Sequence, residues 1–257
     1  MNAQQLWTAY TTILVKEVLR FSRIWLQTIV PPMITTALYF VIFGNLIGAQ
    51  IGAMEGYSYI DFITPGLIMM TVITNSYANV VSSFYGSKFQ GNVAEMLVSP
   101  MPNWIILAGF VSGGVARGLA VGLAVTLVSL FFSTLSVQHV FITFTIVLLT
   151  AALFSLAGII NAVYAKSFDD ITIIPTFVLT PLTYLGGVFY SITMLPPFWQ
   201  NVSLLNPVLY MVNGFRYGIL GASDMSIWVS YAVIIGFIGL LGGFSLYLLN
   251  KGIGIRS

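Results

Sequence analysis

The few charged residues of this 257-residue chain limit the chemistry that it can perform. Arg117 is the one charged residue deep inside a long apolar segment, about thirteen residues after Trp104 and so ~20 Å along a helix. Burying a guanidinium there costs ~2.5 kcal/mol or more, so its side chain should face protein or water rather than lipid. Arg117 therefore either contacts an anionic or polar substrate group or ties its helix to a neighbouring helix.

The sequence contains no pattern that is typical of a catalytic or metal centre. It has no cysteine, and His139 is its only histidine. It also lacks H-E-x-x-H, G-x-S-x-G and the phosphate-binding pattern G-x-x-x-x-G-K-[ST]. We therefore expect no catalytic residue, no metal site and no cofactor bound by this chain, and we do not expect an enzyme.

The carboxylates that follow the first apolar segment lie at or beyond the ends of apolar segments. Ion-coupled carriers usually place a carboxylate or a histidine among their membrane spans. The pattern argues against the hypothesis of an autonomous secondary carrier or channel but leaves that hypothesis open, because Asp61 lies only about a turn from an apolar segment. These residues are Glu55, Asp61, Glu95, Asp169, Asp170 and Asp224.

The apolar segments that must position these residues predict an all-α integral membrane protein. Hydrophobic residues make up 58% of the chain and charged residues 6%, with a mean hydropathy of +0.97, whereas soluble domains have about 25% charged residues. Six segments are long enough to cross a bilayer. No linker divides the chain, so we expect one transmembrane domain over residues 1–257. The segments are 24–47, 62–84, 104–132, 140–164, 171–190 and 227–249.

Residues 1–23 are predicted to form an amphipathic helix on the membrane surface. Apolar residues such as Trp7, Tyr10 and Ile13 recur at helical spacing, while Glu17 and Arg20 fall largely elsewhere on the helical wheel. The alternative is a polar leader that only flanks the first span. No cleavable signal is recognisable, so we expect an unprocessed chain.

The distribution of lysine and arginine predicts that both termini are cytoplasmic. Cytoplasmic loops of membrane proteins carry an excess of these residues. With six spans, only Arg216 falls on the outer side, where its head is expected in water or among lipid headgroups. The inner side then holds Lys16, Arg20, Arg23, Lys88, Lys166, Lys251 and Arg256.

Glycines surround Arg117 at the spacing that lets helix backbones approach closely. They serve packing within one chain or, alternatively, contact between two copies. They are Gly109, Gly113, Gly114, Gly118 and Gly122.

Two stretches interrupt the apolar pattern. In residues 85–103, Pro100 and Pro102 end any preceding helix, which leaves a short helix around residues 92–99 or an ordinary polar loop. Residues 181–217 are too apolar for a loop, and their glycines and prolines break a helix. Irregular backbone at membrane depth must be buried in protein or line a wet cavity. The helix ends there need hydrogen-bond partners, and the polar side chains that can supply them are Asn201, Ser203, Asn206 and Asn213.

Four motifs in order, GNVAEMLVSP, LGGVFYS, LPPFW and NPVLYMVNGFRYG, resemble the permease subunits of ABC-2 type exporters. The resemblance covers essentially the whole chain. It implies a homodimer in the bacterial inner membrane with two copies of a separate ATPase, which binds ATP and Mg²⁺. It also implies that residues 1–23 are the interfacial connecting helix, 85–103 a cytoplasmic coupling helix and 191–217 a re-entrant extracytoplasmic hairpin.

The resemblance assigns roles to particular residues. ATPase coupling falls to Lys88, Glu95, Met96, Leu97 and Pro100, and the re-entrant lid contains Pro196, Pro197, Pro207, Tyr210 and Arg216. We place Arg117, Tyr184 and Tyr190 as possible residues of the translocation path, although these aromatics equally suit a core or an interfacial belt. The expected function is export of a drug, lipid or glycan; no nucleic acid partner is indicated.

Overall fold

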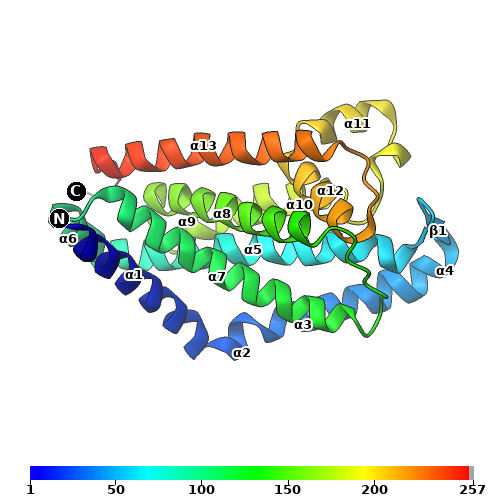
Figure 1. The fold of residues 1–257 in the computed structure, drawn as a ribbon, viewed down its shortest axis with the longest axis horizontal. Coiled ribbons are helices and arrows are strands. Elements are labelled where there is room, and N and C mark those ends of the chain that lie inside the picture. Colours follow the sequence, from blue (N-terminus) through cyan, green and yellow to red (C-terminus); the bar gives the residue numbers. More distant parts are fainter. Residues whose placement is uncertain (255–257) are drawn as a thin grey trace.

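The computed structural model describes residues 1–254 and shows an elongated helical bundle (Figure 1). Five helical segments are long and apolar enough to cross a membrane, which confirms the all-helical membrane architecture. They are Trp25–Gly44, Tyr59–Phe89, Asn103–Ser129, Val140–Tyr164 and Ile227–Lys251.

The N-terminal half of the bundle contains helices α1 to α7 and one short β-hairpin. Its elements are α1 (Ala3–Arg23), α2 (Trp25–Thr28), α3 (Val30–Tyr39), the π-helix η1 (Phe40–Ile47), α4 (Gly48–Ile51), β1 (Ala53–Met54), β2 (Tyr57–Ser58), α5 (Tyr59–Phe89), α6 (Asn92–Val98) and α7 (Asn103–Ser129). The two strands pair antiparallel, with Ala53 opposite Ser58.

The C-terminal half contains two long helices, α8 and α13, with shorter helices between them. Its elements are α8 (Val140–Tyr164), α9 (Asp170–Ile174), the π-helix η2 (Pro175–Leu179), α10 (Thr180–Tyr184), the 3-10 helix η3 (Ile192–Met194), α11 (Pro197–Leu204), α12 (Pro207–Leu220) and α13 (Ile227–Lys251).

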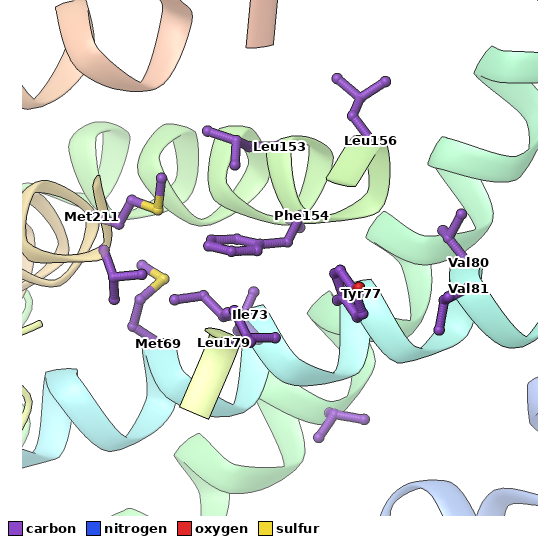
Figure 2. Packing of buried hydrophobic residues seen from close by; sticks show 14 of the residues in the cluster. Met69, Ile73, Tyr77, Val80, Val81, Leu153, Phe154, Leu156, Leu179 and Met211 are labelled. Carbon is purple, nitrogen blue, oxygen red and sulfur yellow. The ribbon is translucent and has the colours of Figure 1, made fainter. Parts of the chain in front are cut away.

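Helix α5 is the centre of the bundle and packs against α7, α8 and α12. Its first turn is capped by Ser58, whose hydroxyl accepts a hydrogen bond from the Asp61 N–H at 3.2 Å. Figure 2 shows Tyr77 of α5, Phe154 of α8 and Met211 of α12 in the buried apolar cluster. Because most of α5 is buried, it forms the scaffold for the polar groups described below.

The expected fifth span, residues 171–190, is a broken helix rather than one long one. Residues 170–184 form α9, η2 and α10 in succession, and the interruption falls at Pro175, which cannot donate a backbone hydrogen bond. The chain then turns at Gly187, whose φ of 71° favours glycine. This segment is too short to count among the five helices long enough to cross a membrane.

The two ends of the bundle differ in composition. Figure 1 places α6 at the same end as the start of α1 and the end of α13, while β1, α4 and α11 lie at the opposite end. Lys16, Lys88 and Lys251 belong to segments that begin or end near α6, and Arg256 lies outside the described residues. The arrangement is consistent with the charge asymmetry in the sequence.

Candidate functional site

A polar cluster lies within the bundle where α1 meets α5 and α7. Arg117 Nη2 donates a hydrogen bond to Asn75 Oδ1 at 3.2 Å. Arg20 Nη2 donates to the Asn79 carbonyl oxygen at 2.9 Å and to Asn79 Oδ1 at 2.7 Å. Since the two asparagines are four residues apart on α5, they share one helix face. Two cations are therefore held by neutral amides of the central helix.

Glu17 belongs to this cluster, and its place on the polar side of the predicted N-terminal helix was wrong. Its side chain is fully buried, and Ser83 Oγ donates a hydrogen bond to Glu17 Oε1 at 2.5 Å. Arg20 Nη2 lies 3.5 Å from Glu17 Oε2. The physical reason is shape: a Cβ on Gly113 of α7 would lie 2.4 Å from Glu17 Cβ, so the glycine leaves the space that Glu17 fills.

The glycines around Arg117 pack within the chain. A Cβ on Gly109 would overlap Ile13 of α1, at 2.6 Å from its Cγ2. A Cβ on Gly118 would overlap the Ser76 hydroxyl of α5. Helix α7 therefore uses one glycine face against α1 and another against α5. Close packing of this kind fixes the position of Arg117 between them.

A groove of about 260 Å³ separates α3 from α5 and ends beside this cluster. Asn75, which holds Arg117, lines the groove together with Pro31, Thr35 and Tyr39 of α3. The Tyr39 and Tyr184 hydroxyls lie 3.0 Å apart, so a residue of α10 contacts the groove lining. Two of the predicted path residues, Arg117 and Tyr184, therefore each hydrogen-bond to a residue that lines the groove.

Arg216 is buried rather than exposed at the outer surface, so that expectation was wrong. Its side chain has no solvent exposure, and its guanidinium carbon lies 3.9 Å from the Phe62 ring centroid. Nη2 donates to the Gly187 carbonyl oxygen at 2.6 Å, Nε to the Phe62 carbonyl oxygen at 3.4 Å and Nη1 to Asn213 Oδ1 at 3.4 Å. The breaks in residues 181–217 expose carbonyl oxygens that only a buried donor can satisfy.

Two carboxyls meet above Arg216, at the end of the bundle opposite α6. The two-residue turn between β1 and β2 presents Glu55, and the loop before α13 presents Asp224. Asp224 accepts hydrogen bonds from Ser191 Oγ at 2.7 Å and from the Ile192 N–H at 3.1 Å. Both carboxyls interact electrostatically with Arg216. The pair therefore joins three separate segments of the chain.

The pKa values of the two carboxyls shift in opposite directions. The pKa of Glu55 is raised above its usual value of 4.5, mainly by a hydrogen bond to Asp224 and, as the second cause, by burial. Burial alone would raise the pKa of Asp224, but hydrogen bonds from Glu55, Ser191 and Ile192 outweigh it and lower that pKa below 3.8. As the pH rises, Asp224 therefore loses its proton before Glu55 does.

The predicted hairpin consists of the exposed helix α11 and the buried helix α12. Pro197 and Pro207 stand at the first positions of these helices, where their missing N–H groups cost nothing. Asn206 caps α12 by accepting a hydrogen bond from the Val208 N–H at 3.0 Å, and it donates to the Leu182 carbonyl oxygen at 2.7 Å.

Two other residues of the predicted lid, Pro196 and Tyr210, lie next to α11 and in α12. Pro196 precedes α11, and the Tyr210 hydroxyl donates to the Leu204 carbonyl oxygen at 2.8 Å. The Tyr190 hydroxyl is buried without a partner among residues 1–254. These positions suit packing of the hairpin, and only Tyr184 of the aromatic path residues reaches the groove through Tyr39.

The short helix predicted around residues 92–99 is present as α6 (Asn92–Val98). It starts after Gly91, whose φ of 81° ends α5, and it stops before Pro100. Glu95 is exposed, Met96 and Leu97 are half-buried, and Val93 anchors the helix in the core. Lys88 differs from its neighbours: its Nζ donates to carbonyl oxygens of Val163 and Ala165 at 2.6 and 2.7 Å, and so caps α8.

Comparison with known proteins decides the family. A family model described as ABC-2 type transporter matches residues 8–220. The chain belongs to the ABC-2 type transporter family. The inner membrane transport permease YadH of Escherichia coli strain K12 is 59% identical over 252 residues, which cover 98% of each chain. Nodulation protein J of Rhizobium leguminosarum bv. viciae is 19% identical over 220 residues, or 85% of each chain. The protein is therefore a membrane transport permease of this ABC-2 family.

Sequence reasoning missed three members of the polar cluster in this ABC-2 permease. Glu17 was assigned to a solvent-facing side, and Asn75 and Asn79 were not singled out. A usable signal was present, because two asparagines at i and i+4 in an apolar span are costly unless they meet polar partners. Arg20 and Arg117 were the natural partners to test.

Proposed function

We propose that this permease is the membrane subunit of an ATP-driven exporter that moves an amphipathic or hydrophobic substrate, such as a drug, lipid or glycan, out of the cytoplasm. A separate ATPase subunit binds ATP and Mg²⁺ and supplies the energy. Two copies of this chain and two of the ATPase form the complex. The name of the similar YadH permease supports an inner-membrane location.

The observation that carries the proposal is the position of α6. It is a short helix that connects the long helices α5 and α7 in the chain; it packs against α5, and Val93 is buried while Glu95 stays exposed. A partner that pushes on α6 thereby moves two central spans. An element of this kind is what a permease driven by a separate motor requires.

The proposed topology has six crossings with both termini in the cytoplasm. Residues 171–190 make the fifth crossing as a broken helix, and residues 191–217 re-enter from outside without crossing. The common end of α1, α6 and α13 in Figure 1 and the lysines and arginines near it support this orientation.

The experiment is copurification of the permease with its ATPase, followed by nucleotide-dependent transport in liposomes. We expect Glu95→Ala to lower transport at least about tenfold, because an exposed charge at a partner contact steers and positions that partner. Asn92→Ala, on the same exposed helix, is the matched control and should keep full transport. ATPase binding and transport that are both unchanged in Glu95→Ala would contradict the coupling role.

An autonomous ion-coupled carrier is the second candidate, and the burial of Glu17 favours it. A carboxylate packed against Gly113 of α7 lies inside the bundle, where carriers place ionisable groups. This candidate predicts transport by the purified chain without nucleotide, and loss of that transport in Glu17→Gln. The exporter predicts no transport without the ATPase.

A further inference from the structure

We propose that the groove between α3 and α5, which meets the Arg20–Arg117 cluster at Asn75, binds the anionic head group of an amphiphile. The inference rests on the proposed export function, for which it names the substrate class. The head group is a phosphate, sulfate or carboxylate, and the apolar part of the amphiphile lies along the outer side of α3.

The first observation is an excess of positive charge. The cluster contains two guanidiniums, those of Arg20 and Arg117, against the single carboxylate of Glu17. That carboxylate already accepts the 2.5 Å hydrogen bond from Ser83, and its distance to Arg20 is long, at 3.5 Å. Lys16 Nζ stands 3.9 Å from Glu17 and adds a further cation. Arg117 therefore has no carboxylate partner within residues 1–254.

The second observation is a surplus of hydrogen-bond donors. Arg20 Nε, Arg117 Nε and Asn79 Nδ2 are buried and have no acceptor among the described residues. Buried donors are normally satisfied, and a group of them in one place requires an explanation. An oxyanion supplies several acceptor lone pairs, no donor and a negative charge, so it matches this surplus; a cation supplies no acceptor, and a neutral sugar brings donors with its acceptors and no charge.

The third observation is the groove itself. Its volume of about 260 Å³ is just below the ~300–1,000 Å³ of sites that enclose a drug-sized ligand, so it accommodates part of a ligand. Thr35, Thr71 and Thr74 line it beside Asn75. Ile34 and Leu38 of α3 are exposed next to it and offer an apolar surface for the remainder of the ligand. Arg117 lies behind this wall and reaches the groove through its hydrogen bond to Asn75.

The test is native mass spectrometry of the full-length permease in a neutral detergent, titrated with dioleoyl phosphatidic acid. We expect saturable binding that dioleoyl phosphatidylcholine does not reproduce. Arg117→Gln should weaken binding at least about tenfold, because it removes a charge-assisted contact, and Arg117→Lys should restore most of it. Arg23→Gln removes an exposed cation of α1 and is the matched control, with binding unchanged.

A groove-filling variant keeps the test decisive if Arg117→Gln does not fold. Thr74→Leu leaves both arginines in place and should also weaken phosphatidic acid binding. Equal binding of both lipids, or full binding by Arg117→Gln or Thr74→Leu, overturns the proposal. Complete displacement of phosphatidic acid by inorganic phosphate assigns the site to a free anion and overturns the amphiphile.

Two further outcomes separate this inference from its alternatives. The chain has no cysteine, so Thr35→Cys provides a single crosslinking site. Disulfide-linked dimers that form equally with and without phosphatidic acid show that a second copy covers the groove, and they overturn the proposal. Failure to copurify with an ATPase overturns the exporter but leaves the lipid-binding result standing, since binding is measured on the permease alone.

Discussion

Replacing Arg216 by alanine tests whether this residue holds the broken segment in place. The substitution removes a fully buried guanidinium whose three nitrogens each have an acceptor. A charged hydrogen bond contributes ~1.5–3 kcal/mol and a desolvated cation–π contact about 2 kcal/mol. We therefore expect Arg216→Ala to lower the free energy of unfolding by ~4 kcal/mol.

The assay is thermal unfolding in detergent, followed by tryptophan fluorescence. At ~2–4 °C per kcal/mol for a chain of this size, Tm should fall by at least about 8 °C. Arg23→Ala removes an exposed cation and should change Tm by about 2 °C or less. Arg216→Lys keeps the charge but donates to fewer acceptors, so its Tm should lie between that of Arg216→Ala and that of the wild type. A Tm of Arg216→Ala within about 2 °C of the wild type would refute the structural role.

Three other predictions concern packing, pH and helix capping. A Cβ on Gly66 would lie 2.6 Å from the Val188 carbonyl oxygen, so Gly66→Ala should lower the free energy of unfolding by ~1–3 kcal/mol, measured by chemical unfolding. Gly86→Ala in the same helix is the control, because a Cβ there meets open space and should not destabilise the protein. The raised pKa of Glu55 gives stability at acid pH that is lost as pH rises through that pKa, and the lowered pKa of Asp224 gives stability that is lost as pH falls through it. Tm should therefore decrease from about pH 4 towards neutrality in the wild type and stay level in Glu55→Gln, which keeps a donor; parallel Tm curves for the two would contradict the raised pKa of Glu55. Lys88→Met should remove the cap of α8 and lower the free energy of unfolding by ~1–3 kcal/mol. An unchanged free energy of unfolding would contradict this capping role and favour the ATPase-coupling role that the resemblance implies.

Local signals were enough to predict the long helices and α6. A bilayer-length apolar run specifies a spanning helix almost independently of its neighbours, because every backbone group is satisfied within the helix. The start of α6 follows from Gly91 and its end from Pro100, both of which act on the backbone at their own positions. Such features need no knowledge of tertiary contacts.

Positions that depend on a partner helix were not predictable in this way. Hydropathy placed Glu17 in solvent because its charge is costly inside a membrane, yet the space beside Gly113 and the Ser83 hydroxyl reverse that cost. The same holds for Arg216, whose acceptors come from α5 and from the turn at Gly187. Those acceptors exist only once the broken segment is folded against α5.

Comparison of the two arginines explains why only one of them points to a ligand. Arg216 has an acceptor for each nitrogen, an aromatic face at 3.9 Å and two carboxyls nearby, so its burial is compensated by the chain. Arg117 has one hydrogen bond to a neutral amide, a buried Nε without an acceptor and a groove beside its partner Asn75. A charge of the first kind stabilises structure. A charge of the second kind is stabilised when an anion binds beside it, and this supports the proposed anion site at the groove next to Asn75.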